Sequence, residues 1–202
     1  MKKILLLTCF IGTHLLGNSD INESNFLDHL GSIEFFSASF VQKTISSKTE
    51  RTVEGTIKAN RKGKFKLSYE EPLNEVLFSD GINLHRFDPD LEQLDIQPIE
   101  NILKETPIGL FSSGIKELKK SFKVERCLKL KKKTKCNLSV VSNESFLDSI
   151  EFILTNGFID SIRYKDSFDQ VVLLTLSNTS YKNIPDNAFH FIIPPGIDVV
   201  QY

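Results

Sequence analysis

Short stretches of alternating apolar and polar residues, separated by strong turn signals, are the feature that most limits the folds open to this chain. Residues 53–59 alternate Val, Gly, Ile and Ala with Glu, Thr and Lys, and residues 64–69 alternate Phe, Leu and Tyr with Lys and Ser. Because successive side chains of a β-strand point to opposite faces, each stretch predicts a strand with one dry and one wet face. Turn sequences at 60–63, 79–81 and 155–157 separate such stretches, so the pattern predicts an antiparallel meander.

The same signals recur along the chain and predict about ten or eleven strands in all. An amphipathic helix is expected between Asn18 and Leu30, and two or three short helical turns between residues 98 and 120. Helices of this length are not stable alone in water, so they are expected to pack on the dry face of the sheet. The further strands are expected at 92–96, 122–130, 136–141, 147–154, 158–165, 170–177 and 189–193, the last of them ended by the Pro-Pro-Gly sequence at 194–196.

Two architectures fit such a mainly β chain. About eight strands just fill a closed barrel with side chains, so ten or eleven strands curled into one unclosed barrel would leave a hollow lined by the dry faces. In a two-sheet sandwich the same faces would pack against each other and leave no space. Sixteen Phe with no Trp suit a dense core as well as a lipid-binding cavity, and periodicity does not separate the two.

The first residues have the form of a secretory signal peptide. Lys2 and Lys3 precede an apolar run that is too short to span a bilayer, and the run ends in a small-x-small sequence at 17–19. Residues 1–19 are therefore expected to be cleaved, and residues 20–202 to form one exported domain. The alternative is a lipid anchor, because the residues that end in Cys9 loosely resemble a lipobox.

Two cysteines remain if Cys9 leaves with the signal peptide. Cys127 and Cys136 form an even pair that would enter an oxidising compartment, and a disulfide closing the hairpin between them is expected. A metal site is not expected there, because no His lies nearby to complete the ligand set. The acidic residues of 88–92 are also better explained by a turn fixed by proline than by calcium binding.

Charge excludes some partners and leaves one question open. The formal net charge of −1 favours neither nucleic acid nor a strongly acidic partner. Residues 119–136, however, contain nine Lys or Arg and a single acidic residue, Glu125. This basic stretch is either a solvated strand pair whose lysines discourage edge-to-edge aggregation, or a surface attracted to anionic lipid or an acidic partner.

Five segments of the chain carry a family resemblance: FFSASFVQ (35–42), EGTIKANRKGKFKLSY (54–69), LFSDGINLHRFDPDLEQ (77–93), TPIGLF (106–111) and FHFIIPPGIDVV (189–200). Together they resemble the periplasmic outer-membrane lipoprotein carrier family, LolA. The resemblance implies a single unclosed antiparallel β-barrel with a helical lid, a monomer whose cavity holds the acyl chains of a lipoprotein. It also implies that the protein receives lipoproteins from an inner-membrane ABC-type transporter, crosses the periplasm and delivers them to an outer-membrane receptor.

The resemblance also assigns roles to residues. Arg61 stands where the family has a barrel arginine that hydrogen-bonds to the lid backbone and holds the closed state, although Lys62 replaces the proline that usually follows. Phe65 matches an inward aromatic, whereas His85 and Arg86 replace the usual aromatics, which puts a polar group near the wall or changes which side chain points inward. The residues expected to line the acyl-chain cavity are Phe65, Leu67, Tyr69, Leu77, Leu84, Ile102, Leu103 and Phe152.

Three other function classes suit the sequence less well than a carrier. A lipid- or lipoprotein-sensing module or receptor with the same half-barrel would be favoured by a lipidated Cys9. An integral outer-membrane barrel is disfavoured by the short strands, the helical interval and the sequence Ile-Pro-Pro-Gly at 193–196. An enzyme is disfavoured because no acid/base pair or nucleophile constellation is present in the sequence. Neither a cofactor, a metal nor nucleic acid is expected.

Overall fold

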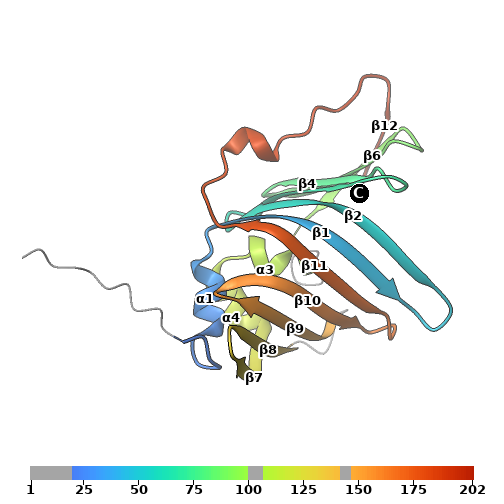
Figure 1. Ribbon diagram of the computed structural model, residues 1–202. Coiled ribbons are helices and arrows are strands. Elements are labelled where there is room, and N and C mark those ends of the chain that lie inside the picture. Colours follow the sequence, from blue (N-terminus) through green and yellow to red (C-terminus); the bar gives the residue numbers. More distant parts are fainter. Residues whose placement is uncertain (1–19, 100–106, 142–146) are drawn as a thin grey trace, which may run out of the picture.

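One large, strongly curved sheet dominates the computed structural model, which describes residues 20–99, 107–141 and 147–202 (Figure 1). The expected signal peptide, Cys9, Ile102 and Leu103 lie outside these residues. The strands are β1 (Phe35–Ile45), β2 (Glu50–Asn60), β3 (Lys64–Tyr69), β4 (Val76–Asp80), β5 (Asn83–Asp88), β6 (Gln93–Pro98), β7 (Phe122–Leu130), β8 (Lys133–Val140), β9 (Leu147–Thr155), β10 (Phe158–Asp166), β11 (Val171–Ser180) and β12 (Asp198–Gln201).

The sheet is a meander with two long-range pairings, β1–β11 and β6–β12. Its strand order is β12-β6-β5-β4-β3-β2-β1-β11-β10-β9-β8-β7, and the β1–β11 pairing joins the N-terminal strands to the C-terminal ones. No pairing joins β7 to β6 or β12 within the described residues, so the sheet curls without closing. The predicted mainly β, unclosed architecture is confirmed, and the two-sheet sandwich is excluded because all the strands belong to one sheet.

The end of the chain corrects two details of the strand prediction. The described residues contain 12 strands, and the strand expected at 189–193 is wrong: a 3-10 turn, η1 (Asp186–Phe189), is followed by extended chain without strand pairing. The last strand is β12, which pairs with β6 in parallel rather than antiparallel.

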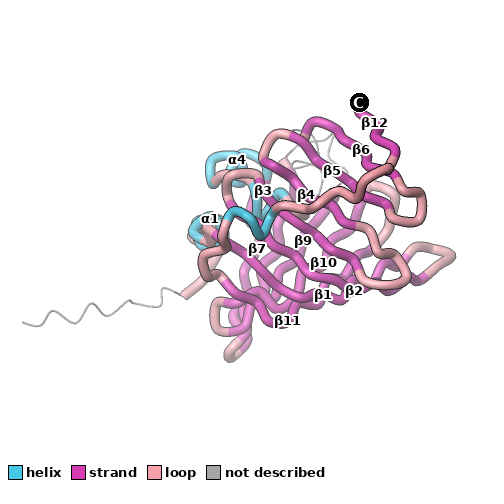
Figure 2. The backbone as a smooth tube through the Cα atoms, turned by 90° about the horizontal axis from the view of Figure 1, so that it is seen from above, coloured by secondary structure: helices cyan, strands magenta, loops and turns pink. Residues whose placement is uncertain are grey.

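The reason for this difference lies on the outer face of the sheet. Phe78, Phe87 and Leu94 are buried there, and Phe191 and Ile197 of the C-terminal segment pack against them. The segment crosses the outer face of β2, β3 and β4 before it reaches β6 (Figure 2). Phe191 and Ile197 therefore cover a neighbouring sheet face and do not extend the meander, whereas Ile192 between them stays 91% exposed.

Among the described residues, three short helices lie against the concave face (Figure 1): α1 (Phe26–Ser32), α3 (Gly109–Ser112) and α4 (Ile115–Ser121). Phe26 is fully buried, and its ring meets that of Phe152 edge to face with centroids 5.3 Å apart. Gly31 lets α1 approach α4 closely, since a Cβ there would lie 2.2 Å from Ile115 Cδ1. As expected, the helices cover the dry face of the sheet.

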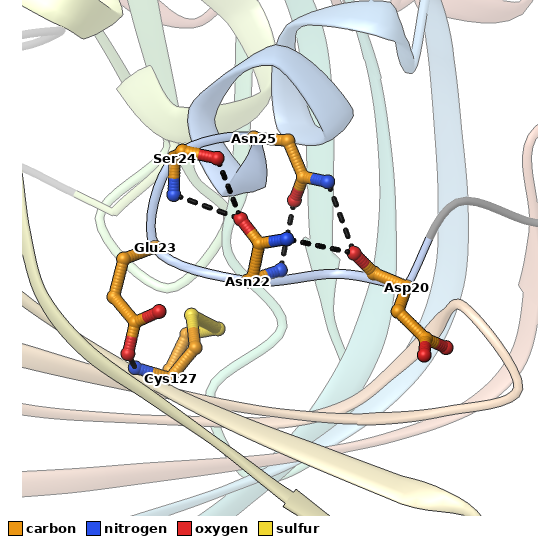
Figure 3. Close-up of a disulfide and its surroundings, with 7 residues drawn as sticks. Asp20, Asn22, Glu23, Ser24, Asn25 and Cys127 are labelled. Carbon is orange, nitrogen blue, oxygen red and sulfur yellow. Dashed lines mark hydrogen bonds between the residues drawn. A yellow bond between two sulfur atoms is a disulfide. The ribbon is translucent and has the colours of Figure 1, made fainter.

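The first helix begins later than the sequence pattern predicts. Residues 20–25 precede it as turns in which Asn22 and Asn25 donate side-chain hydrogen bonds to the carbonyl of Asp20 (Figure 3). Asn25 Oδ1 also accepts a hydrogen bond from the backbone N–H of Asn22, at 2.8 Å. Short polar side chains compete in this way with the helical backbone pattern, which confines the helix to residues after Asn25.

The expected disulfide is present. Cys127 and Cys136 lie directly opposite each other in β7 and β8, with an S–S distance of 2.01 Å. Glu23 accepts a hydrogen bond from the backbone N–H of Cys127 at 2.8 Å, so the segment before α1 lies against β7 (Figure 3). The disulfide thus fastens the hairpin at the edge of the sheet.

Removing this disulfide is expected to lower the free energy of unfolding. A sequence separation of 9 residues corresponds to roughly 2–3 kcal/mol in the chain-entropy description. Urea unfolding of a Cys127→Ala/Cys136→Ala variant would measure the loss. A reducing agent should produce the same loss in the unchanged protein and none in the variant, and equal stability of the oxidised protein and the variant would contradict the expectation.

Candidate functional site: an apolar cavity under the helices

A cavity of about 230 Å³ lies between the concave face of the sheet and the chain around α3. Phe36 and Phe111 close one side of it, with their rings stacked at a centroid distance of 3.9 Å. The lining comes from β1 to β5, β10, β11 and the residues that lead into α3: Phe36, Phe40, Gln42, Ile57, Phe65, Leu67, Tyr69, Leu77, Leu84, Pro107, Ile108, Phe111, Ile162, Tyr164, Leu174 and Leu176. Almost all of these side chains are apolar, so the cavity suits hydrocarbon.

Strand β3 shows how the sequence places side chains in this cavity. Phe65, Leu67 and Tyr69 point inward. The alternate residues point outward, where Lys64 forms an ion pair with Asp186 at 2.7 Å and Lys66 donates to the carbonyl of His190. The period of two that predicted the strand therefore also sorts its residues between cavity and surface.

Most of the predicted cavity residues in the described part of the chain come together here. Phe65, Leu67, Tyr69, Leu77 and Leu84 all contribute to the lining. Phe152 does not, because the ring of Phe26 covers it.

The polar residues after Leu84 lie on opposite faces of β5. His85 lies on the outer face, stacked on Phe78 with centroids 4.6 Å apart. Arg86 shares the inward face with Leu84 and lies opposite the cavity-lining Leu77. It forms a bidentate ion pair with Glu75, with distances of 3.0 and 2.7 Å. Arg86 therefore places a polar group near the cavity wall, one of the two expected outcomes.

Several lining residues were not among the predicted ones. Phe36 and Phe40 belong to the segment 35–42 that carried part of the family resemblance, and Leu174 and Leu176 belong to a predicted strand. Their alternating positions were a usable signal. Tyr164 and Gln42 add polar groups to the lining, which hydrophobic alternation alone does not indicate.

The cavity becomes more polar toward the beginning of β2. A neighbouring hollow shares Gln42, Tyr69 and Leu77 with it and is otherwise lined largely by polar residues, including Arg51 and Glu75. Burial raises the pKa of Tyr69 and of Tyr164 above their usual value, so both phenols stay neutral. The site thus offers an apolar interior next to a polar mouth, which fits a molecule with an apolar tail and a polar head.

Arg61 ties the helices to the sheet at the other end of β2. Its guanidinium donates to the carbonyl of Ile33 at 3.0 Å, to those of Leu110 and Ser113 at 2.6 and 2.9 Å, and also to that of Leu30. These carbonyls belong to the C-terminal ends of α1 and α3, where helices leave acceptors unpaired and carry partial negative charge. One side chain therefore satisfies the ends of two helices.

The electrostatics of Arg61 are those of a half-buried cation without a carboxylate partner among the described residues. Burial lowers its pKa to about 10, which still leaves it charged at neutral pH. The turn that presents it is fixed by Asn60, whose Oδ1 accepts hydrogen bonds from the N–H groups of Lys62 and Lys64. Arg61 therefore reaches the ends of the helices although Lys62 replaces the usual proline.

Comparison with known proteins places the chain in a family. The sequence profile of the family described as "Outer membrane lipoprotein carrier protein LolA" matches residues 31–192. The chain belongs to the LolA family. It is 31% identical over 176 residues to an outer-membrane lipoprotein carrier protein of Hahella chejuensis, covering 85% of this chain and 84% of that protein. A carrier protein of Chromohalobacter salexigens is 28% identical over 175 residues, with 85% and 83% covered.

Solved structures agree on the LolA-type fold. A LolA superfamily protein from Nitrosomonas europaea superposes with a TM-score of 0.51 at 11% identity, covering 85% of this chain and 98% of that one. An uncharacterised conserved protein from Thermus thermophilus superposes with a TM-score of 0.57 at 11% identity, with 89% and 98% covered. In the part of the chain that the structure describes, no cluster of side chains suited to a metal ion occurs, and no helix is long and apolar enough to cross a membrane.

Proposed function

We propose that this protein is a periplasmic chaperone that carries lipoproteins by enclosing their acyl chains in the cavity. The observation that carries the proposal is the apolar cavity itself, walled by the curved sheet and covered by helices whose ends Arg61 holds. Membership of a family described as outer membrane lipoprotein carriers supports it. The role is one of binding and release, and no catalytic step is assigned.

Hydrophobic transfer explains why such a carrier is needed. Exposing an acyl chain of about sixteen carbons to water costs on the order of ten kcal/mol, at roughly 0.8 kcal/mol for each methylene. Unassisted passage of a multiply acylated protein between two membranes would therefore be very slow. An apolar cavity replaces water around the chains and removes most of this barrier.

The size of the cavity indicates that cargo displaces the helices. A volume of about 230 Å³ lies below the roughly 300–1,000 Å³ of ordinary ligand sites, and a lipoprotein has more than one acyl chain to place. Loading therefore requires α1 and α3, the lid helices, to move off the concave face. Such a movement breaks the hydrogen bonds of Arg61, so Arg61 acts as the latch of the empty carrier.

The donor and the acceptor of the cargo belong to the same proposal. We propose an ABC-type transporter of the inner membrane as the donor, because extracting acyl chains from a bilayer requires energy, and an outer-membrane receptor as the acceptor. The closed lid of the empty protein favours release over retention, since Arg61 recovers its four acceptors only after the cargo leaves.

Mass spectrometry of the protein purified from the periplasm is the direct test. Triacylated proteins or their lipid-modified N-terminal peptides are expected to co-purify with it. A Leu174→Glu variant, altered in the cavity wall, serves as the control and should carry none. Recovery of no acylated species, or of equal amounts with both proteins, would contradict the proposed function.

A further inference from the structure

The β7–β8 hairpin carries an exposed cluster of apolar and basic side chains that transport inside the cavity does not explain. β7 is an edge strand of the sheet, and all six residues from Leu128 to Lys133 are exposed. Leu128 and Leu130 remain 36% and 57% exposed, although each lies directly opposite a lysine of β8. Neighbouring exposed apolar side chains rimmed by polar residues are typical of interaction surfaces.

Strand register places these side chains on one face. Leu128 lies opposite Lys135, and Leu130 opposite Lys133, whereas Cys136 of the intervening row is buried on the concave side. The row that contains Leu130 and Lys133 continues through Thr155 to Phe158, which is 46% exposed. The ring of Phe158 stacks on Tyr181 with centroids 5.0 Å apart, so its orientation is held. The outer face of this sheet edge therefore presents apolar side chains surrounded by positive charge.

The tip of the hairpin is positively charged, although its backbone favours Asn or Gly at one position. Lys131 has a φ of +55°, in the left-handed region where Asn and Gly are preferred. The adjacent β9–β10 turn uses Asn156 and Gly157 at φ values of +52° and +83°, and the N–H of Asn156 donates to the carbonyl of Lys132. The β9–β10 turn thus has residues that suit its backbone, whereas the hairpin tip has a lysine at its left-handed position.

Ion pairs within the protein neutralise part of this charge, including that of Lys133, whose Nζ lies 3.9 Å from Asp160. Lys129 is paired with Asp20, and Lys135 with Glu151 at 2.6 Å. Arg126, Lys131 and Lys132 form no ion pair with any described residue. The disulfide near the tip links both strands, so the hairpin is already ordered. It therefore loses little conformational entropy when it binds.

We propose that this surface, formed by Arg126, Leu128, Leu130, Lys131, Lys132 and Phe158, docks the protein on an anionic phospholipid bilayer. The leucines and Phe158 enter the headgroup region while the basic side chains meet lipid phosphates, which is how amphipathic surfaces bind membranes. A projecting hairpin suits a flat lipid surface, and exposed leucines favour lipid over an acidic protein. The docking is additional to the proposed transport and does not depend on it.

Docking on this surface would also bring the lid near the bilayer. His29 of α1 lies 3.3 Å from the carbonyl of Gly157, in the turn beside the hairpin tip. The surface is therefore at the end of the molecule that bears the helices (Figure 1).

Vesicle flotation of the purified protein, its N-terminus defined by mass spectrometry, tests the proposal. Binding is expected to vesicles of phosphatidylethanolamine with phosphatidylglycerol but not of phosphatidylcholine alone, and should weaken as salt is added. Lys131→Asn/Lys132→Gln should weaken binding by roughly 30-fold without lowering the unfolding temperature, because Asn tolerates the positive φ of residue 131. Leu128→Ser/Leu130→Ser should weaken it by about tenfold.

The controls separate docking from general charge and from misfolding. Lys48→Asn/Lys182→Asn removes the same charge from exposed lysines elsewhere and should keep most of the affinity. A turn variant that is as stable as the unchanged protein yet binds less strongly cannot be explained by misfolding. The proposal is overturned if the unchanged protein does not distinguish the two vesicle types. It is also overturned if the hairpin variants bind vesicles normally, even if they no longer bind an acidic protein.

Discussion

A glutamate at position 174 is expected to abolish acyl-chain binding while leaving the empty protein folded. Leu174 points into the cavity and lies opposite Gln42 and Ile162 on its neighbouring strands. It is only half-buried, so in the empty protein water can reach the new carboxylate. An acyl chain would remove that water, and an unpaired charge in an apolar site costs several kcal/mol, so affinity should fall by at least about 100-fold.

The matched control for this variant is Leu173→Glu. Leu173 is the adjacent residue on the same strand, but it points to the outer face, where its cross-strand neighbours are Lys43 and Arg163. A carboxylate there meets two cations and leaves the cavity unchanged. Displacement of a fluorescent fatty acid measures both variants, and thermal unfolding checks their folds. Equal loss of binding in both, or in neither, would show that acyl chains bind elsewhere.

The sequence predicted the sheet well wherever one face of a strand is wet. Residues 53–59 and 64–69 alternate because their two faces meet different environments, and their strands formed where expected. The pattern failed for residues 189–193, whose first three residues alternate in polarity although the segment does not form a strand. They lie near the outer face of the sheet, and Phe191 packs on Phe78. Alternation predicts burial, but it does not distinguish a strand from a covering segment.

The cavity shows a second limit of the same kind. Phe152, Ile162 and Leu174 lie in one row across β9, β10 and β11 and share the concave face. Ile162 and Leu174 line the cavity, whereas Phe26 of α1 fills the space over Phe152. A strand's periodicity indicates which face is dry. The packing of helices distant in sequence decides which part of that face remains empty.

Arg61 is a case in which only resemblance pointed to the contacts. By itself, an arginine in a turn between two strands is expected to lie in solvent. Its actual acceptors are 28 to 52 residues away in the chain, and no local pattern reports such distances. The structure supplies these contacts, and the latch function built on them is a proposal open to test.

Replacing Arg61 by leucine is expected to open the lid. The carbonyls at the ends of α1 and α3 lose a common donor, so hydrogen exchange of both helices and the rate of fatty acid exchange should rise, the latter by at least about tenfold. The free energy of unfolding should fall by roughly 2–4 kcal/mol. The loss is smaller than four bonds suggest, because the burial that lowers the pKa of Arg61 to about 10 is a cost that leucine removes.

Two further variants distinguish a latch from a generally stabilising cation. Lys62→Leu removes the neighbouring charge, which is exposed, and should change neither exchange rate. Arg61→Lys keeps the charge but lacks the planar fork that reaches several acceptors at once, so its exchange rates should lie between those of the original protein and the leucine variant. If Arg61→Leu lowers stability without changing fatty acid exchange, the helices do not control access to the cavity. If fatty acid exchange is faster in Arg61→Leu but unchanged in Lys62→Leu, opening of the lid depends on the hydrogen bonds of the Arg61 guanidinium. Release of cargo would then begin with the loss of these bonds.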